Sequence, residues 1–245
     1  MTRRPPHRWF GPFALALALA ACPLAWASGL AGVPITQRIG PDEYRAAPAL
    51  WSVAAAPGKI YVASNDGVLV HDGSEWTTVP LPIGVNATVV RRLPDGDIMV
   101  GGNDTYGRLE LDPVRGYRYV DLLASSGLSI ADRRLGPVWE ILQTPEGIYI
   151  QAQHFLHLLP ASGADTRSWP MGPDMRSVMA FGGDLYARFQ DQGLGWLRDG
   201  KLQVVPGGDT FKRVPVSGVV GRGDIQSVDP GNRHLCLNDS GVTQA

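Results

Sequence analysis

Hydrophobic and polar positions alternate along this chain in short runs, and each run ends at residues that form turns. In the clearest stretch, apolar runs cover residues 51–55, 60–63 and 68–70, and a fourth run, residues 75–79, carries Trp76 and two threonines. They are separated by Pro57-Gly58, Asn65-Asp66-Gly67 and Asp72-Gly73, residue types that tolerate the backbone angles of tight turns. No apolar stripe of helical period runs for a useful length. The pattern predicts four short antiparallel strands within about forty residues.

The same unit recurs along the chain. Its five copies are anchored at Ile60, Ile98, Ile148, Leu185 and Leu235. Repeats of this length indicate a stacked or radial architecture. One small sheet exposes two faces and two edges, so neighbouring sheets must bury one another. We therefore expect an all-β fold over residues 50–245, a partial β-propeller of about five four-stranded antiparallel blades.

The last copy stops inside its own blade, because only three residues follow Gly241-Val242. A radial array that does not close leaves an unpaired strand edge, which natural proteins avoid. We therefore expect this chain to be the N-terminal part of a longer protein, either truncated in its gene or incomplete as a sequence.

The N-terminus has the features of an export signal. Arg3, Arg4 and Arg8 precede an uncharged apolar stretch, which predicts a signal helix and a signal peptide over residues 1–27, cleaved after Ala27. The alternative is a lipoprotein signal, in which Cys22 of Leu19-Ala20-Ala21-Cys22 becomes a lipid anchor. Residues 28–49 are rich in Gly, Pro and Ala and are expected to form an irregular arm.

Charge and cysteine content limit the classes of partner and the compartment that we expect for this protein. Without residues 1–27 the chain keeps 19 basic residues against 23 acidic ones, so nothing favours a nucleic-acid partner. Cys236 is then the one remaining thiol, and stability in an oxidising compartment must come from packing. We expect a periplasmic protein, or one that a lipid on Cys22 anchors to a membrane facing the periplasm.

The first copy resembles the blades of the two-component regulator propeller family. The matching residues are Trp51-Ser52-Val53, Gly58, Ile60-Tyr61-Val62, Asn65-Asp66-Gly67-Val68, Asp72-Gly73 and Trp76. Such a resemblance implies a propeller sensor domain followed by further blades, a membrane span and a cytoplasmic histidine kinase or diguanylate cyclase. None of those later parts is encoded in these 245 residues.

Several motifs suggest chemistry but are explained by turns. Gly182-Gly183-Asp184 and Gly207-Gly208-Asp209-Thr210-Phe211 approach the diguanylate cyclase signature, yet each lacks its metal-linked Glu. Arg222-Gly223-Asp224 copies an adhesion tripeptide in a predicted loop, and Asp95 and Asp97 lie in a predicted turn. Paired carboxylates in turns are more often turn formers than acid-base partners. We expect no catalytic residue, no cofactor and no enzymatic activity.

The sequence also offers few candidate residues for a metal site or a ligand site. His154 and His157 form the one close histidine pair, but residues three apart on a strand point to opposite faces, so we expect no metal ligand. Aromatic residues recur in the copies, and either blade packing or an aromatic ligand cage at the central channel explains them. They are Trp51, Trp76, Trp139, Trp169, Trp196, Tyr61, Tyr149 and Tyr186. The sequence assigns no ligand-binding residue.

Two long connections, residues 112–137 and 202–224, interrupt the repeats. The first is expected to form one helical turn or a long loop over one mouth of the propeller, where binding often occurs. Together these features predict the extracytoplasmic ligand-sensing domain of a bacterial receptor without its output module. Its partner would be a small molecule, a glycan or an envelope protein, and the intact receptor would form a homodimer. The alternative is a stand-alone periplasmic or lipid-anchored propeller that acts as a binding scaffold.

Overall fold

The computed structural model describes residues 36–172, 175–213, 216, 225–228, 234–238 and 241–244. The chain divides into two compact units, Met1–Arg38 and Ile39–Ala245, and the fold described below is that of the second. The predicted signal peptide, its cleavage site at Ala27 and the alternative lipid anchor at Cys22 lie outside the described residues.

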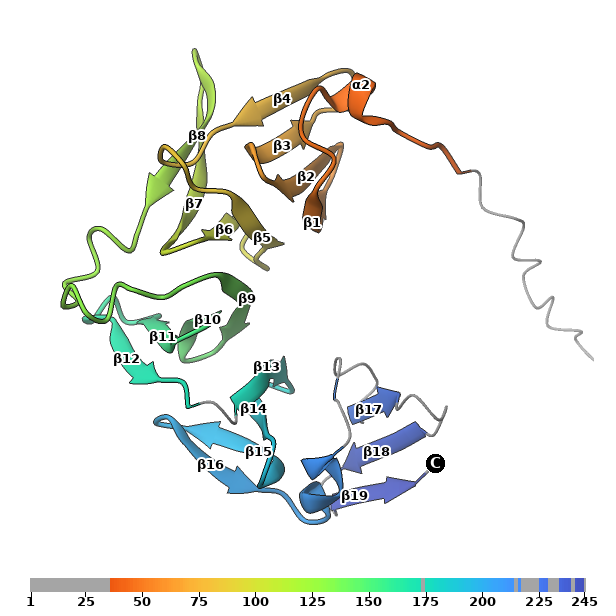
Figure 1. Cartoon of the computed structure of the whole chain (residues 1–245), viewed down its shortest axis with the longest axis vertical. Helices are drawn as coiled ribbons and strands as arrows, with labels where there is room; N and C mark the ends of the chain where they lie inside the picture. The colour runs from red at the N-terminus through yellow and green to blue at the C-terminus, as the bar shows by residue number, and fades with distance from the viewer. Residues whose placement is uncertain are drawn as a thin grey trace, which may run out of the picture. The chain divides into compact units, whose positions relative to one another are not determined.

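Four four-stranded antiparallel sheets follow one another along the second unit (Figure 1). The first contains β1 (Leu50–Ala56), β2 (Lys59–Ser64), β3 (Gly67–His71) and β4 (Trp76–Val79). The second contains β5 (Ala87–Arg92), β6 (Ile98–Gly102), β7 (Thr105–Asp112) and β8 (Gly116–Asp121). The third contains β9 (Val138–Thr144), β10 (Gly147–Ala152), β11 (Phe155–Pro160) and β12 (Arg167–Pro170). The fourth contains β13 (Met175–Phe181), β14 (Asp184–Phe189), β15 (Gly193–Arg198) and β16 (Lys201–Val204).

Three shorter features complete the described elements. The helix α2 (Pro41–Tyr44) precedes the first sheet, and the 3₁₀ helix η1 (Gly208–Lys212) follows the fourth. The three-stranded sheet contains β17 (Ile225–Val228), β18 (His234–Asn238) and β19 (Gly241–Gln244). The structure confirms the predicted all-β fold, a β-propeller built of four-stranded antiparallel blades, and we call each four-stranded sheet a blade.

Strand order within each blade follows the chain, so each blade is a meander joined by tight turns. The five anchor residues predicted from the repeat all lie in the second strand of their sheets: Ile60 in β2, Ile98 in β6, Ile148 in β10, Leu185 in β14 and Leu235 in β18. Turn residues at the ends of the runs fix these boundaries, because they set both strand length and register.

Neighbouring blades bury each other's faces in three apolar clusters. Tyr61 of the first blade packs with Val90 and Val100 of the second. Tyr106 of the second blade lies in a cluster with Ile141 of the third, and a third cluster joins the third and fourth blades. The blades therefore depend on one another for their cores, as the repeat argument required.

The face of the first blade that points away from the second is only partly covered. Tyr44 of α2 packs there against Val62 and Leu69, which are buried. Val53 on β1 stays 63% exposed. Val90 on β5 is the counterpart of Val53 in the second blade, because Val53 pairs with Val62 and Val90 pairs with Val100. Val90 is fully buried against the first blade.

These two valines allow a matched test of blade packing. We expect Val90→Ala to lower the free energy of unfolding by about 2 kcal/mol, because it removes buried methyl groups and leaves a cavity. Val53→Ala is expected to change it by less than about 0.5 kcal/mol. Urea unfolding of both variants measures the difference in the free energy of unfolding. Equal losses in the two variants would show that the face of the first blade that carries Val53 is covered in solution.

The connection between β8 and β9 is a long loop without a helix, so of the two expected forms the structure shows the loop. Asn103 bridges to Pro137, and the Gly136 amide donates a hydrogen bond to Asp104 Oδ1 at 2.7 Å. Leu123 and Leu135 are buried in the cluster of the second and third blades. The loop therefore forms part of the core. In the other long connection, η1 contributes the fully buried Phe211.

Among the described residues, the structure contains no helix that is both long enough and apolar enough to span a membrane.

Candidate functional site

The innermost strand of every four-stranded blade carries a β-bulge just after its first residue. The register shifts occur between Leu50 and Ser52, between Ala87 and Val89, between the partners of Gln151 and Ala152, and between Met175 and Ser177. The residues inserted at the bulges are therefore Trp51, Thr88, Trp139 and Arg176. A bulge disturbs the alternation of a strand and turns a side chain in a new direction, so these four positions mark one recurrent location.

Two of the bulge residues are exposed tryptophans. Trp51 is 57% exposed and Trp139 is 53% exposed. Trp51 is held at one edge, because its Nε1 donates a hydrogen bond to Asn65 Oδ1 at 2.9 Å. Large exposed aromatic side chains on a rigid sheet offer flat contact area at little entropic cost.

The other recurrent aromatic residues contribute to packing. Tyr61, Tyr149 and Tyr186 are buried, and Trp169 and Trp196 are half-buried against Tyr149 and Tyr186. Trp76 is half-buried beside Tyr44. Burial raises the pKa of Tyr61 and of Tyr149 above its ordinary value, as expected for hydroxyls enclosed by packing. The structure thus assigns blade packing to these six and leaves Trp51 and Trp139 for a surface role.

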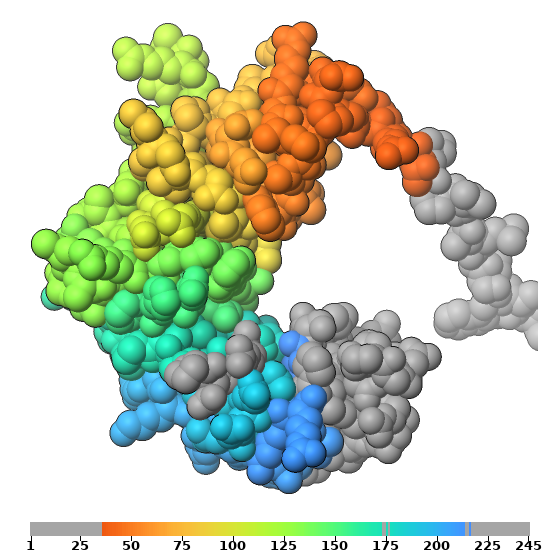
Figure 2. Space-filling model, viewed as in Figure 1, coloured from red at the N-terminus to blue at the C-terminus, as the bar shows by residue number. Residues whose placement is uncertain are grey.

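Trp139 borders two pockets. The larger one, of about 840 Å³, runs along the inner strands β5, β9 and β13, and we call it the groove. Its polar lining includes Arg91, Arg92, Glu140 and Gln143. Figure 2 shows the inner edges of the first three blades, in orange to green, bordering one open space. Trp139 and these polar groups line the same groove, so one ligand bound in the groove would contact both.

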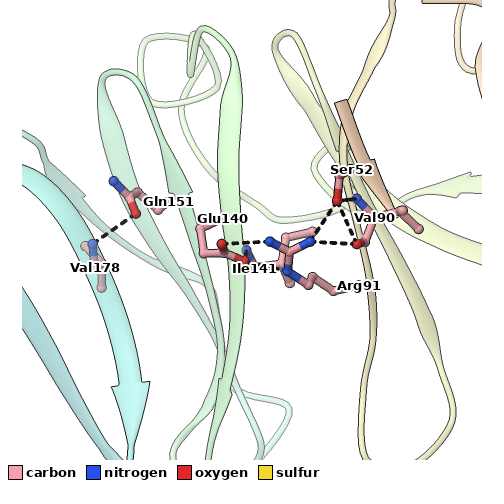
Figure 3. A network of polar contacts seen from close by, with 7 residues as sticks. All are labelled: Ser52, Val90, Arg91, Glu140, Ile141, Gln151 and Val178. Carbon is pink, nitrogen blue, oxygen red and sulfur yellow. Dashed lines mark hydrogen bonds and ion pairs between the residues drawn. The ribbon is translucent and has the colours of Figure 1, made fainter. Parts of the chain in front are cut away.

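One arginine ties three inner strands together beside the groove (Figure 3). Arg91 pairs with Glu140 through two hydrogen bonds, from Nε to Oε1 at 2.7 Å and from Nη2 to Oε2 at 2.8 Å. Its Nη1 also donates to Ser52 Oγ at 2.7 Å. A two-pronged arginine–carboxylate pair fixes geometry as well as charge. Since Glu140 follows Trp139 directly in β9, the pair fixes the strand that carries the indole.

Two further side chains join the inner strands. Thr88 Oγ1 donates to the Val138 carbonyl oxygen at 2.6 Å, which links β5 to β9. Gln151 is buried, and its Oε1 accepts a hydrogen bond from the Val178 amide at 3.1 Å, which links the third blade to β13 (Figure 3). The third blade, which forms one wall of the groove, is therefore hydrogen-bonded to the second blade on one side and to the fourth blade on the other.

The structure places most of the suggestive motifs in turns or structural elements. Gly182 and Gly183 form the turn between β13 and β14, with φ of 60° and 90°. Gly208 to Phe211 lie in η1. The Asp97 amide donates to Asp95 Oδ1 at 3.1 Å within a turn. The tripeptide Arg222-Gly223-Asp224 lies outside the described residues.

The two histidines are not brought together. His154 is exposed in the turn before β11, whereas His157 is completely buried in β11. Tyr106 and the Nδ1 atom of His157 lie at hydrogen-bonding distance, 3.3 Å. Within the described part of the chain, no group of three or more His, Cys, Asp or Glu side chains is arranged to hold a metal ion.

Sequence reasoning missed the contacts that shape the groove. Arg91 and Glu140 are 49 residues apart, and no local pattern connects them. The repeats in the sequence already match Trp51 with Trp139, which are 88 residues apart, but the bulge that exposes them arises from strand pairing.

No protein-family model matches this chain, and no curated protein sequence matches it. Solved structures do share its fold. Virginiamycin B lyase from Staphylococcus aureus, in complex with quinupristin, aligns with a TM-score of 0.58 and 15% identity over 80% of this chain and 69% of the lyase. An extracellular domain assigned to a hybrid two-component system of B. thetaiotaomicron aligns with a TM-score of 0.53 and 15% identity, over 80% of this chain and 26% of that one. YCF48 bound to D1 peptide aligns with a TM-score of 0.56 and 11% identity, over 80% and 66%.

These similarities correct one expectation. We expected the chain to have no enzymatic activity, because its turns and strands lack a recognisable acid-base set. The similar structures overturn that expectation, since they include a lyase with this fold, and the missing motifs therefore do not exclude an enzyme. At 12–15% identity the similarity concerns the fold alone, and a shared fold does not assign a reaction. The same fold carries an enzyme and an extracellular domain of a two-component system.

Proposed function

We propose that this chain is the ligand-binding propeller of an extracytoplasmic receptor of the two-component regulator propeller type, and that the groove is its ligand site. The observation that carries this proposal is the pair of exposed tryptophans at equivalent bulges, with Trp139 bordering a groove of about 840 Å³. The similarity in fold to extracellular domains of two-component systems supports it.

A glycan is the ligand class that this surface fits best. Indole rings offer flat apolar faces to sugar rings, and Gln143 and Arg92 add exposed hydrogen-bonding groups along the same groove. The propeller acts as a sensor if glycan binding favours one of two receptor arrangements, because a ligand shifts an equilibrium only through differential affinity.

Calorimetric titration of the purified chain with a panel of neutral and acidic oligosaccharides tests the site. We expect at least one to bind, and Trp139→Ala to weaken that binding by more than about tenfold, as loss of a buried aromatic anchor does. Ile83→Ala is the matched control, because Ile83 is fully exposed and lies outside the groove. Binding that survives Trp139→Ala would contradict the proposed site. The same mixtures are analysed for chemical conversion of the oligosaccharide, which tests for enzymatic activity.

The DNA sequence that follows this gene segment distinguishes a receptor from a stand-alone binding scaffold. We expect the reading frames beyond the codon for Ala245 to encode a membrane span and a histidine kinase or diguanylate cyclase. Unrelated sequence there would favour the alternative, a periplasmic or lipid-anchored propeller that binds a glycan or an envelope protein without signalling.

A further inference from the structure

A lysine and two tyrosines meet where the first and second blades pack. Lys59 Nζ donates a hydrogen bond to the Tyr117 hydroxyl oxygen at 3.0 Å, and the hydroxyl oxygens of Tyr61 and Tyr117 lie 2.9 Å apart. Lys59 and Tyr61 belong to β2, whereas Tyr117 belongs to β8, the outer strand of the second blade. One phenol oxygen therefore lies within hydrogen-bonding distance of two polar groups from another blade.

The fold holds these three side chains in place. Residues two apart on a strand point to the same face, so Lys59 and Tyr61 both project toward the second blade. Tyr61 is 3% exposed within the apolar cluster of the first two blades. Its ring meets that of Tyr117 edge to face, with the ring centroids 5.8 Å apart, and Tyr117 packs against the same cluster while it is only half-buried. Tyr117 is thus fixed in position but not enclosed.

The contacts of Tyr117 favour its ionised form. Burial alone raises the pKa of a phenol, but the hydrogen bonds from Tyr61 and Lys59 and the positive charge of Lys59 outweigh burial and lower the pKa of Tyr117 below its ordinary value. The pKa of Tyr61 moves upward, through burial and the same hydrogen bond, although Arg92 of β5 acts on it in the opposite direction. Tyr61 therefore donates the hydrogen bond when Tyr117 ionises.

Tyr119 provides a comparison on the same strand. It lies two residues after Tyr117 in β8, is half-buried as well, and packs against the same apolar cluster. Its hydroxyl lies 2.8 Å from Thr105 Oγ1, which is a neutral partner, and burial raises the pKa of Tyr119. The two tyrosines therefore differ in whether a cation contacts the phenol oxygen.

A phenolate is a nucleophile, whereas a neutral phenol is a weak one, and a lowered pKa activates such a group. We infer that Tyr117 is a nucleophilic tyrosine, and that activated sulfonyl and acyl donors modify this protein at its hydroxyl oxygen. With a sulfonyl fluoride, the phenolate oxygen attacks sulfur and an O–S bond forms. The S–F bond breaks, and its electron pair leaves with fluoride. The phenol proton passes to solvent, and no atom changes its oxidation state.

This site is separate from the proposed glycan groove. Lys59, Tyr61 and Tyr117 do not line the groove, and the inference about Tyr117 does not depend on a glycan ligand. Either proposal can therefore fail without the other.

Labelling of the full chain with benzenesulfonyl fluoride, a neutral reagent, tests the inference. Peptide mass mapping is expected to find Tyr117 modified at least about fivefold faster than Tyr119. Lys59→Met removes the charge and Tyr61→Phe removes the hydroxyl but keeps the ring, and each is expected to slow labelling of Tyr117 by more than about threefold. Lys201→Met is the matched control, because Lys201 is an exposed lysine on β16 of the fourth blade, and it is expected to leave the rate unchanged.

An absorbance titration measures the ionisation directly. The tyrosinate signal of the unsubstituted chain minus that of Tyr117→Phe reports Tyr117, and its midpoint is expected below the ordinary pKa of 10.0. In the Lys59→Met background the midpoint is expected to rise, because the phenolate loses its cation.

Three results would overturn the inference. One is labelling of Tyr117 no faster than that of Tyr119, a comparison within one molecule that needs no variant. Another is a Tyr117 labelling rate that both Lys59→Met and Tyr61→Phe leave unchanged. The third is a titration midpoint of Tyr117 at or above 10.0, the ordinary pKa of a tyrosine.

Discussion

Gly67→Ala is expected to lower the free energy of unfolding by about 3 kcal/mol or more, and Gly58→Ala by only about 1 kcal/mol. Gly67 begins β3 with φ of 119°, and a Cβ atom added there would overlap the carbonyl oxygen of Val79. That oxygen belongs to the backbone of β4, so relief requires the outer strand of the blade to move. The overlap adds to the cost of a backbone angle that side chains rarely adopt.

Gly58 is the matched control for this effect. It also has a positive φ, 70°, but nothing lies within 4 Å of an added Cβ. Chemical denaturation of both variants separates the cost of the backbone angle from the cost of the overlap. Gly193 begins β15 with φ of 99° and the same kind of overlap, with the Gly208 oxygen, so Gly193→Ala is expected to resemble Gly67→Ala. Equal losses at Gly58 and Gly67 would contradict the proposed packing of β3 on β4.

The free energy of unfolding is expected to fall by up to about 3 kcal/mol as the pH drops from 6.5 to 4, through the single residue His157. Burial lowers the pKa of His157 from 6.5 to about 4, against a smaller raising effect of Asp132. Above pH 6.5 the imidazole is neutral in both states. Between the two pKa values the unfolded chain binds a proton that the folded chain does not, so stability is lost as the pH falls.

His157→Leu is expected to remove most of this pH dependence, because an apolar side chain fills the same site between Tyr106 and Phe155 without titrating. His154→Gln is the control, since His154 is exposed, and it is expected to keep the slope. Urea unfolding at pH 7.5, 6.5, 5.5 and 4.5 measures how the free energy of unfolding of each variant depends on pH. A slope that survives His157→Leu would contradict the assignment.

Carboxylates affect a lower pH range. Hydrogen bonds from the Glu75 and Ser74 amides lower the pKa of Asp72, and Arg108 and Arg118 lower that of Glu110. Their contributions are present above the ordinary carboxylate pKa and are lost as the pH falls below it. Between pH 6.5 and about 5.5 these carboxylates are ionised in both the folded and the unfolded chain and do not contribute to the loss of stability, whereas below about pH 5 they add to the loss that His157 causes.

Local pattern was enough to predict the strands and the anchors. The run 60–63 became Lys59–Ser64, and the run 68–70 became Gly67–His71, because alternation and turn residues act over a few positions. The same argument could not separate Trp51 and Trp139 from Trp169 and Trp196. Residue type is identical in both sets, and only strand pairing decides which side chain a bulge exposes.

Contacts between distant segments were also beyond the sequence. Arg91 contacts Glu140, 49 residues away in the sequence. The loop before β9 buries Leu135 in the core, although the sequence predicted one helical turn or a long loop over one mouth of the propeller. The expectation of no enzymatic activity was overturned by the fold, which virginiamycin B lyase shares. Local motifs could not test it, because one fold can carry both enzymes and binding domains.

The sequence by itself determined that this protein is an all-β repeat of four-stranded units, because turn residues and two-residue alternation set each hairpin locally. The tertiary structure alone decided which faces are buried and which aromatic residues border pockets. It also brought Lys59 and Tyr61 of the first blade to the Tyr117 hydroxyl of the second. Those outcomes depend on how blades pack across dozens of residues, and no short window of sequence contains that information.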